Sequence, residues 1–162
     1  MDESTQEEPI AWTPQDARYR AGFKLEELVE FLRAASNSEE DFNSSVAYLH
    51  QALDKAADKV RSKSQAEVSL VGQVDALIDT LYFTYGSFVL MGVDPEQLFD
   101  IVHRANMGKI FPDGKAHFDP VTHKILKPDD WEEKYAPEGA IKEELERQIQ
   151  AYQRSIEQKE EN

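Results

Sequence analysis

The sequence predicts an all-α protein, an antiparallel four-helix bundle followed by a C-terminal loop and an extra helix. Four long segments carry apolar residues at helical spacing, and polar runs, glycines and prolines separate them. No internal repeat and no strand-like alternation of useful length appears in the chain. Because 162 residues with 40% hydrophobic content support one core of ordinary size, we expect the four segments to pack as one helical domain.

The first two expected helices are amphipathic and have recognisable ends. The first covers residues 15–35, with Asp16 as a candidate cap, and it stops before a polar run. The second covers residues 39–62, and Ser38 together with Asp41 resembles a capping box. Its apolar residues follow a spacing close to 4,3,4, which is typical of a purely structural amphipathic helix.

The third and fourth expected helices are separated by a glycine and a proline. The third covers residues 65–91 and is the most apolar segment of the chain, so we expect it to be central, with Gly92 as its C-terminal stop. The fourth begins at Asp94-Pro95-Glu96, which supplies a cap, a proline at the first position and an acidic residue in the first turn.

The rest of the chain divides into two further parts. From 108 to 137, glycines, prolines, lysines and histidines stand among few apolar residues, which predicts a long ordered loop. A highly charged segment with one apolar side follows, and we expect it to pack as a helix on the domain or on a neighbouring subunit. The predicted organisation is a flexible acidic arm over 1–14, a helical domain over 15–137 and a charged C-terminal helix over 138–162.

Composition and charge exclude several classes of function. The formal net charge of −14 argues against binding to nucleic acid or to an anionic membrane, since both need an excess of Lys and Arg. The chain has no cysteine, so disulfides and thiol chemistry are excluded. No basic leader with an apolar stretch opens the sequence, and polar residues interrupt its most apolar segment. We therefore expect a soluble, cytoplasmic protein.

Five carboxylates at helical spacing are the most informative feature of the chain. Glu26, Glu27 and Glu30 lie three and four residues apart in the first helix, and Asp75 and Asp79 lie one turn apart in the third. The two aspartates stand among apolar residues that a core would need. Because like charges are unfavourable together in a core unless a cation or a proton compensates them, the sequence favours a bound divalent metal ion.

Three stretches of the chain resemble the all-alpha nucleotide pyrophosphohydrolases, the group of MazG-like enzymes, dimeric dUTPases and phosphoribosyl-ATP pyrophosphohydrolases. They are GFKLEELVEFLRAA, VDALIDTLYFTYGSFVLMGVDPEQLFDIVHRANMGKI and DGKAHFDPVTHKILKP. The resemblance covers Arg18 to Pro128, and its most specific part is the run HRANMGK followed by DGK and KILKP. It implies the all-alpha bundle of this group.

The resemblance also implies a metal site. The family motif is EExxE on one helix, which Glu26, Glu27 and Glu30 match, and ExxD on a later helix, whose last residue is Asp79. This sequence departs from the motif at Ala76, where a glutamate would stand. Asp75, one position earlier, is the nearest substitute, as a ligand or as a residue behind the ligands.

The implied activity is hydrolysis of a nucleoside triphosphate between the α and β phosphates, which gives a nucleoside monophosphate and pyrophosphate. The implied ion is Mg²⁺, with Mn²⁺ as the alternative, and it suits ligands that are carboxylates and water. Glu27 is our candidate for the base that takes the proton of the attacking water. Because a triphosphate needs compensating cations and fixed donors, the candidate substrate-binding residues are Arg104, Asn106, Lys109, Lys115, Lys124 and Lys127.

Other functions remain open at the level of the sequence. The expected enzyme binds a nucleotide and forms a homodimer or homotetramer, because four short helices with such an apolar third one have more apolar surface than a monomer covers. The alternative is a non-catalytic helical adaptor that keeps a structural cation, which Ala76 supports. A ferritin-like metal carrier is the weaker third option, since the Asp100-x-x-His103 pattern occurs once and such sites use two copies.

Overall fold

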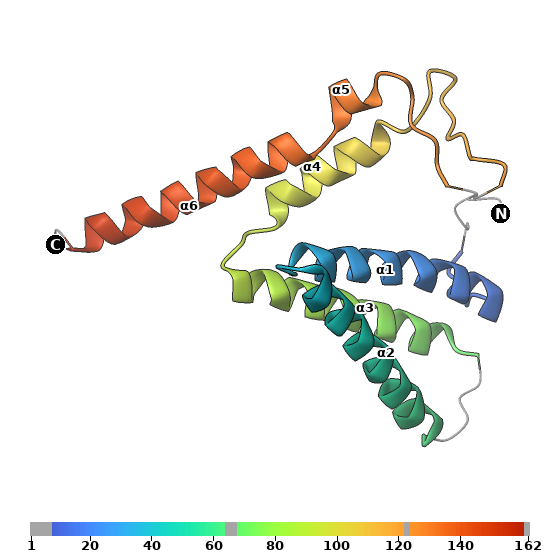
Figure 1. Cartoon of the computed structure of the whole chain (residues 1–162). Helices are drawn as coiled ribbons and strands as arrows, with labels where there is room; N and C mark the ends of the chain where they lie inside the picture. The colour runs from blue at the N-terminus through green and yellow to red at the C-terminus, as the bar shows by residue number, and fades with distance from the viewer. Residues whose placement is uncertain (1–7, 64–67, 122–123, 161–162) are drawn as a thin grey trace. The chain divides into compact units, whose positions relative to one another are not determined.

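The computed structural model describes residues 8–63, 68–121 and 124–160, and over these ranges the chain forms six helices (Figure 1). They are α1 (Pro14–Ala34), α2 (Glu39–Arg61), α3 (Leu70–Met91), α4 (Glu96–Met107), α5 (Trp131–Tyr135) and α6 (Glu138–Glu160). The predicted all-α class is confirmed: α1 to α4 are the four expected long helices, and α6 is the extra one. The chain divides into two compact units, residues 1–79 and 80–162, which are described separately.

In the first unit, α1 begins at a cap that the sequence analysis misplaced. Thr13, not Asp16, is the N-cap: its hydroxyl accepts from the Asp16 amide at 3.3 Å and donates to the Asp16 carboxylate at 2.6 Å. The preceding residue is also held, because the Trp12 amide donates to Gln73 Oε1 at 2.8 Å and Gln73 Nε2 donates to the Trp12 carbonyl at 3.0 Å. The last residues of the predicted flexible arm are therefore tied to α3, while its first seven lie outside the described residues.

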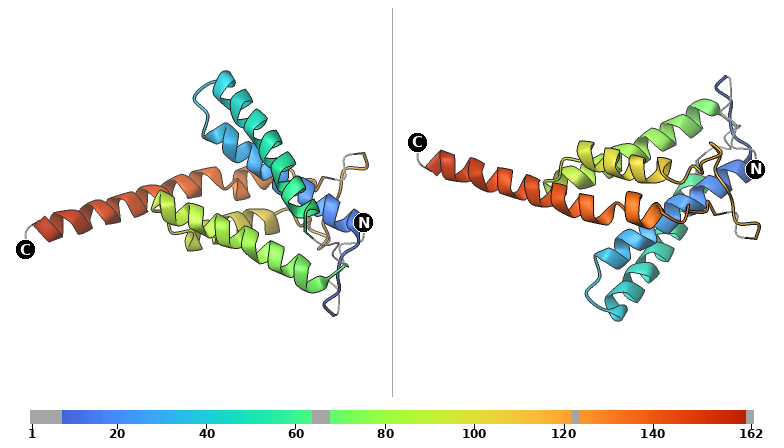
Figure 2. Two further views of the ribbon diagram at one scale, coloured as in Figure 1. Left: turned by 90° about the horizontal axis from the view of Figure 1, so that it is seen from below. Right: turned by 90° about the horizontal axis from the view of Figure 1, so that it is seen from above.

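The α1–α2 hairpin follows the sequence prediction closely (Figure 2). The Ser38 hydroxyl accepts from the Asp41 amide at 3.1 Å, so the expected cap of α2 is confirmed. Across the turn, Arg33 pairs with Glu39 at 2.8 Å, and its guanidinium also lies 5.1 Å from the centre of the Phe42 ring. These contacts fix the direction in which α2 leaves α1, and the two helices pack against each other.

Helix α3 ends as predicted, and its apolar side chains are exposed in the single chain. Gly92 has φ 69°, a left-handed value that a glycine adopts without steric cost, and the Val93 amide donates back to the Phe88 carbonyl. The start of α3 is at Leu70; the expected start at residue 65 lies outside the described residues. Its apolar side chains, including Val71, Leu81 and Tyr82, are exposed, because the described helices of one chain do not cover them. Over the described ranges, no helix is apolar enough over sufficient length to cross a membrane.

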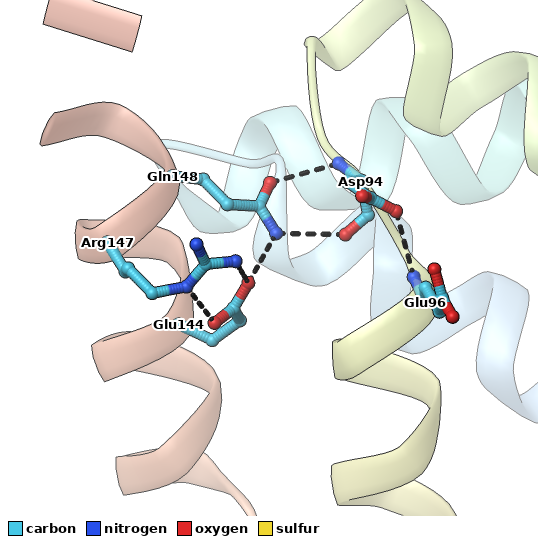
Figure 3. Close-up of polar contacts among 5 residues, drawn as sticks. All are labelled: Asp94, Glu96, Glu144, Arg147 and Gln148. Carbon is cyan, nitrogen blue, oxygen red and sulfur yellow. Dashed lines mark hydrogen bonds and ion pairs between the residues drawn. The ribbon is translucent and has the colours of Figure 1, made fainter. Parts of the chain in front are cut away.

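In the second unit, α6 packs on α4, and one glutamine ties it to the start of that helix (Figure 3). Gln148 of α6 accepts from the Asp94 amide at 2.9 Å and donates to the Asp94 carbonyl at 2.9 Å. Asp94 in turn accepts from the Glu96 amide at 3.1 Å, so this residue orders the beginning of α4 as expected, although Pro95 occupies the N-cap position itself.

Glu144 supports this contact and makes it sensitive to acid. Its carboxylate accepts from Arg147 at 2.6 and 2.7 Å and from Gln148 at 2.9 Å, and these bonds lower the pKa of Glu144 from 4.5 to about 2. A lowered pKa in the folded state means that the stabilisation is complete above the unfolded pKa and is lost as the pH falls through the folded one.

We therefore expect Glu144→Gln to lower the midpoint of urea unfolding at pH 7, and the difference from the parent protein to shrink between about pH 4.5 and pH 2. The neighbouring exposed residue supplies the control, Glu143→Gln, which should leave the midpoint unchanged over this range. A Glu144→Gln difference that stays constant down to pH 2 would contradict the assignment.

Candidate active site

The candidate metal ligands of α1 lie on an exposed face of that helix. Glu26 and Glu27 are neighbours in one turn and Glu30 lies in the next turn, four and three residues later, so each of the first two shares a side of the helix with Glu30. All three residues are exposed. Helical geometry thus brings the expected EExxE residues together, as the spacing predicted.

Asp75 and Asp79 lie one turn apart on α3, in the same unit as α1. Both are exposed, so the premise that the two aspartates are buried in a core is wrong for the single chain; the apolar residues that surround them in sequence are themselves uncovered. Within the part of the chain that the structure describes, no three His, Asp or Glu side chains converge on one point as a closed metal cage would require.

The chemistry of these carboxylates nevertheless fits Mg²⁺. This ion takes hard oxygen ligands, keeps several waters and is held in nucleotide-processing sites by one or two carboxylates together with substrate phosphates. A pair of carboxylates one helical turn apart, open to solvent, meets that requirement, and a closed protein cage is not needed. Glu26 with Glu30 on α1, and Asp75 with Asp79 on α3, are two such pairs.

In the second unit, Trp131 anchors the described end of the loop between α4 and α6 on α4. This residue is 4% exposed, and its Nε1 donates to the Ala105 carbonyl of α4 at 2.8 Å. Tyr135 lies against Gly108 so closely that an added Cβ would collide with its ring, so glycine is required there. Trp131 and Tyr135 both belong to the short α5, which the sequence analysis did not predict.

Three of the candidate substrate-binding residues gather at this tryptophan. Lys127 Nζ lies 3.9 Å from the centre of the Trp131 ring, and Lys109 Nζ lies 5.9 Å from it. Lys109 also donates to Asn106 Oδ1 at 2.8 Å, and Lys127 pairs with Glu132 at 2.8 Å. Cations over the indole face are attracted by the ring quadrupole. Lys109 and Lys127, which are 18 positions apart in sequence, thus form one basic group at Trp131, and the Asn106 side chain is bonded to Lys109.

The other three candidates are placed differently. Arg104 lines a pocket of about 170 Å³ together with Lys134 and Tyr135, beside the Trp131 anchor. Lys115 lies in the turn of a small hairpin, where its amide donates to Asp113 Oδ1 at 3.0 Å and Gly114 has φ 77°. The Lys124 carbonyl accepts from the Asp119 amide at 2.9 Å, next to a separate bridge between Phe118 and Ile125.

The hairpin that contains Lys115 also brings His117 and Asp113 together. His117 Nε2 lies 2.8 Å from Asp113 Oδ2, and its ring stacks on Phe111 with centroids 4.2 Å apart. The hydrogen bond from His117, followed by that from the Lys115 amide, holds the pKa of Asp113 below its usual value. His103 of α4 stacks on Phe99, which agrees with a structural role for the single Asp-x-x-His pattern.

Trp131, Lys134 and Tyr135 are the residues that sequence reasoning missed. Pro128 followed by Asp129 and Asp130 is a possible helix start. Trp131 is a bulky apolar side chain inside an otherwise polar loop. A five-residue helix offers too few positions for a helical period, so periodicity did not reveal it.

Comparison with known proteins identifies the relatives of this chain. Residues 1–106 match the family model of phosphoribosyl-ATP pyrophosphohydrolase. A crystal structure from Exiguobacterium sp. 255-15, described as that of a "putative NTP pyrophosphohydrolase", is 37% identical, with a TM-score of 0.82. The match covers 93% of this chain and 89% of that one. No curated protein matches the chain.

Proposed function

Because the chain belongs to the phosphoribosyl-ATP pyrophosphohydrolase family, and is therefore a hydrolase of phosphoanhydride bonds in nucleotides, we propose that its substrate is a nucleoside triphosphate. The bond cleaved lies between the α and β phosphates, and the products are a nucleoside monophosphate and pyrophosphate. Such an enzyme, similar to MazG-like proteins, would remove or control nucleotides of the cellular pool.

The observation that carries this proposal is that the chain holds both kinds of group that a triphosphate needs, exposed carboxylates in the first unit and a basic group in the second. The exposed carboxylates of α1 and α3 suit Mg²⁺, with Mn²⁺ as the alternative. The Lys109 and Lys127 ammonium groups at Trp131, with Arg104 at the adjacent pocket, are concentrated in a chain whose net charge is −14. A local basic group in so acidic a protein is a suitable place for an anion.

Each candidate residue has a chemical role in the proposal. Glu26, Glu30 and Asp79 would hold the ion, with Asp75 as a further ligand or as a residue that orients one. When bound, the ion would neutralise phosphate charge and increase the acidity of a water molecule. Glu27 would accept the proton of the attacking water. The lysines and Arg104 would bind phosphate oxygens, and the Asn106 amide would contact the sugar or base.

The first experiment incubates the purified full-length protein with Mg²⁺ and a panel of canonical and modified nucleoside triphosphates. Phosphorus NMR or ion-exchange chromatography then resolves pyrophosphate from orthophosphate. We expect one pyrophosphate for each nucleoside monophosphate, and no turnover when EDTA removes the ion. A matched reaction with phosphoribosyl-ATP tests whether the substrate is instead that of the family's namesake.

The products distinguish the possible outcomes. Orthophosphate with a nucleoside diphosphate would contradict cleavage at the α–β bond. Absence of turnover with both Mg²⁺ and Mn²⁺ would favour a non-catalytic adaptor, which Ala76 in place of the motif glutamate supports. We also propose that the protein works as a homodimer or homotetramer, because the large apolar side chains of α3 are exposed in the single chain.

A further inference from the structure

Lys115, a candidate substrate-binding residue, stands at the tip of a short hairpin with a fixed backbone. We call residues 110–117 the DGK hairpin. Ile110 and Ala116 form an antiparallel bridge, and the Phe111 amide donates to the Lys115 carbonyl at 2.9 Å. The Gly114 amide closes the turn by donating to the Phe111 carbonyl at 2.8 Å. The Lys115 backbone therefore has a defined place in the turn.

Asp113 closes the DGK hairpin with both oxygens of its carboxylate. Its Oδ1 accepts from the Lys115 amide at 3.0 Å, the bond of an Asx turn, and its Oδ2 lies 2.8 Å from His117 Nε2. The His117 ring stacks on Phe111, with an angle of 24° between the ring planes. A two-stranded hairpin by itself is only marginally stable in water, so these side chains decide whether the turn keeps its shape.

The side-chain bonds of Asp113 and His117 stay within the DGK hairpin. The two side chains are 51% and 46% exposed, and exposed ion pairs contribute little to the stability of a protein. Among the described residues, neither side chain bonds to a helix. The effect of this pair is therefore confined to what the hairpin carries, and the candidate functional group that it carries is Lys115.

The Lys115 ammonium has no acidic partner in the part of the chain that the structure describes. By contrast, Lys127 of the same loop pairs with Glu132 at 2.8 Å. The acid nearest to Lys115 in sequence is Asp113, whose two oxygens are used by the Lys115 amide and by His117. A cation without a partner, in a chain of net charge −14, is available to an anion from solution.

We propose that Asp113 is a positioning residue for Lys115: it fixes the Lys115 backbone, and its bond to His117 keeps its second oxygen away from the Lys115 ammonium, which is left to bind a phosphate group of the substrate. This role rests on the proposed function, in which Lys115 contacts phosphate. It requires no contact of Asp113 with the substrate or with the metal ion.

The test measures the dissociation constant of inorganic tripolyphosphate, in the presence of Mg²⁺, for the full-length protein by isothermal titration calorimetry. Lys115→Ala and Asp113→Ala should each weaken binding by about tenfold, as loss of one charge-assisted hydrogen bond does. The double variant should bind no more weakly than Lys115→Ala, because Asp113 acts only through that residue. The control Glu143→Ala removes one negative charge from an exposed position of α6 and should leave the dissociation constant unchanged.

Asp113→Asn separates the position of this side chain from its charge. Asparagine keeps an oxygen for the Lys115 amide and offers an N–H to a ring nitrogen of His117, so this variant should bind tripolyphosphate as the parent protein does. Hydrogen exchange of the Lys115 amide needs no ligand: its rate should rise about tenfold in Asp113→Ala and stay at the parent value in Asp113→Asn. In turnover, Asp113→Ala should raise KM for the nucleotide and leave kcat unchanged.

The outcomes separate the role of Asp113 from the proposed activity. Additive losses in the double variant, or an Asp113→Asn loss as large as that of Asp113→Ala, would overturn the positioning role. A parent protein that does not bind tripolyphosphate, or a Lys115→Ala variant that binds it normally, would overturn it as well. Normal binding with the expected variant pattern, but no pyrophosphate from any nucleotide, would contradict the proposed activity and support the role of Asp113.

Discussion

Asp79→Asn is expected to lower kcat for pyrophosphate release by about 100-fold or more while the helices remain intact. The substitution keeps the size of the side chain but removes the charge that a divalent ion requires, and loss of a group that supports a metal site costs at least 10–100-fold. Asp79 is exposed, so its replacement removes no core packing. Pyrophosphate release measures the effect, and circular dichroism at 222 nm measures the helix content.

The matched control is Asp54→Asn, an exposed aspartate on α2 of the same unit, which should leave kcat unchanged. Normal turnover in Asp79→Asn would remove that residue from the site. Asp75→Asn then tests whether Asp75 takes the place of the motif glutamate that is missing at Ala76. A loss as large as that of Asp79→Asn means that Asp75 has replaced the motif glutamate, and retained activity means that it lies outside the ligand set.

Trp131→Ala is expected to lower the free energy of unfolding by about 3–5 kcal/mol, the range for removal of a buried large aromatic side chain. Two losses add here: the packing of the most deeply buried large side chain among the described residues, and the hydrogen bond from Nε1 to the Ala105 carbonyl. Trp131→Phe keeps most of the volume and leaves the carbonyl unpaired, so it should cost about 1–3 kcal/mol. Urea unfolding followed by circular dichroism measures both.

Trp131→Ala should also raise KM for the nucleotide by about tenfold or more, because Lys109 and Lys127 lose the ring that positions them. The control is Trp12→Ala, which removes the other tryptophan, a partly exposed residue of the first unit. If Trp131→Ala and Trp12→Ala unfold at the same urea concentration, Trp131 is not the anchor of the loop.

Local rules were sufficient for the long helices but not for the short α5. The helix predicted over 39–62 is observed over 39–61, and the predicted end of the third helix at residue 91 is observed, because a capping serine, a helical apolar period and a positive-φ glycine act within a few residues of the chain. The family resemblance also needed no structure, since it rests on residues such as Glu26, Glu27, Glu30 and Asp79 at motif spacing. The start of α1 shows the limit of these local rules. Asp16 and Thr13 are both good cap residues, and only the path of the backbone makes Thr13 the cap.

The sequence by itself determined that this protein is helical, where its long helices lie and which carboxylates share a helical face. Only the tertiary structure decided that Trp12 meets Gln73, that Asp94 meets Gln148 and that Trp131 reaches Ala105. These contacts join residues 26 to 61 positions apart, and no period along the chain records such a pairing. It likewise decided that α3 is exposed in one chain, because burial depends on what surrounds a helix and hydrophobicity alone does not set it.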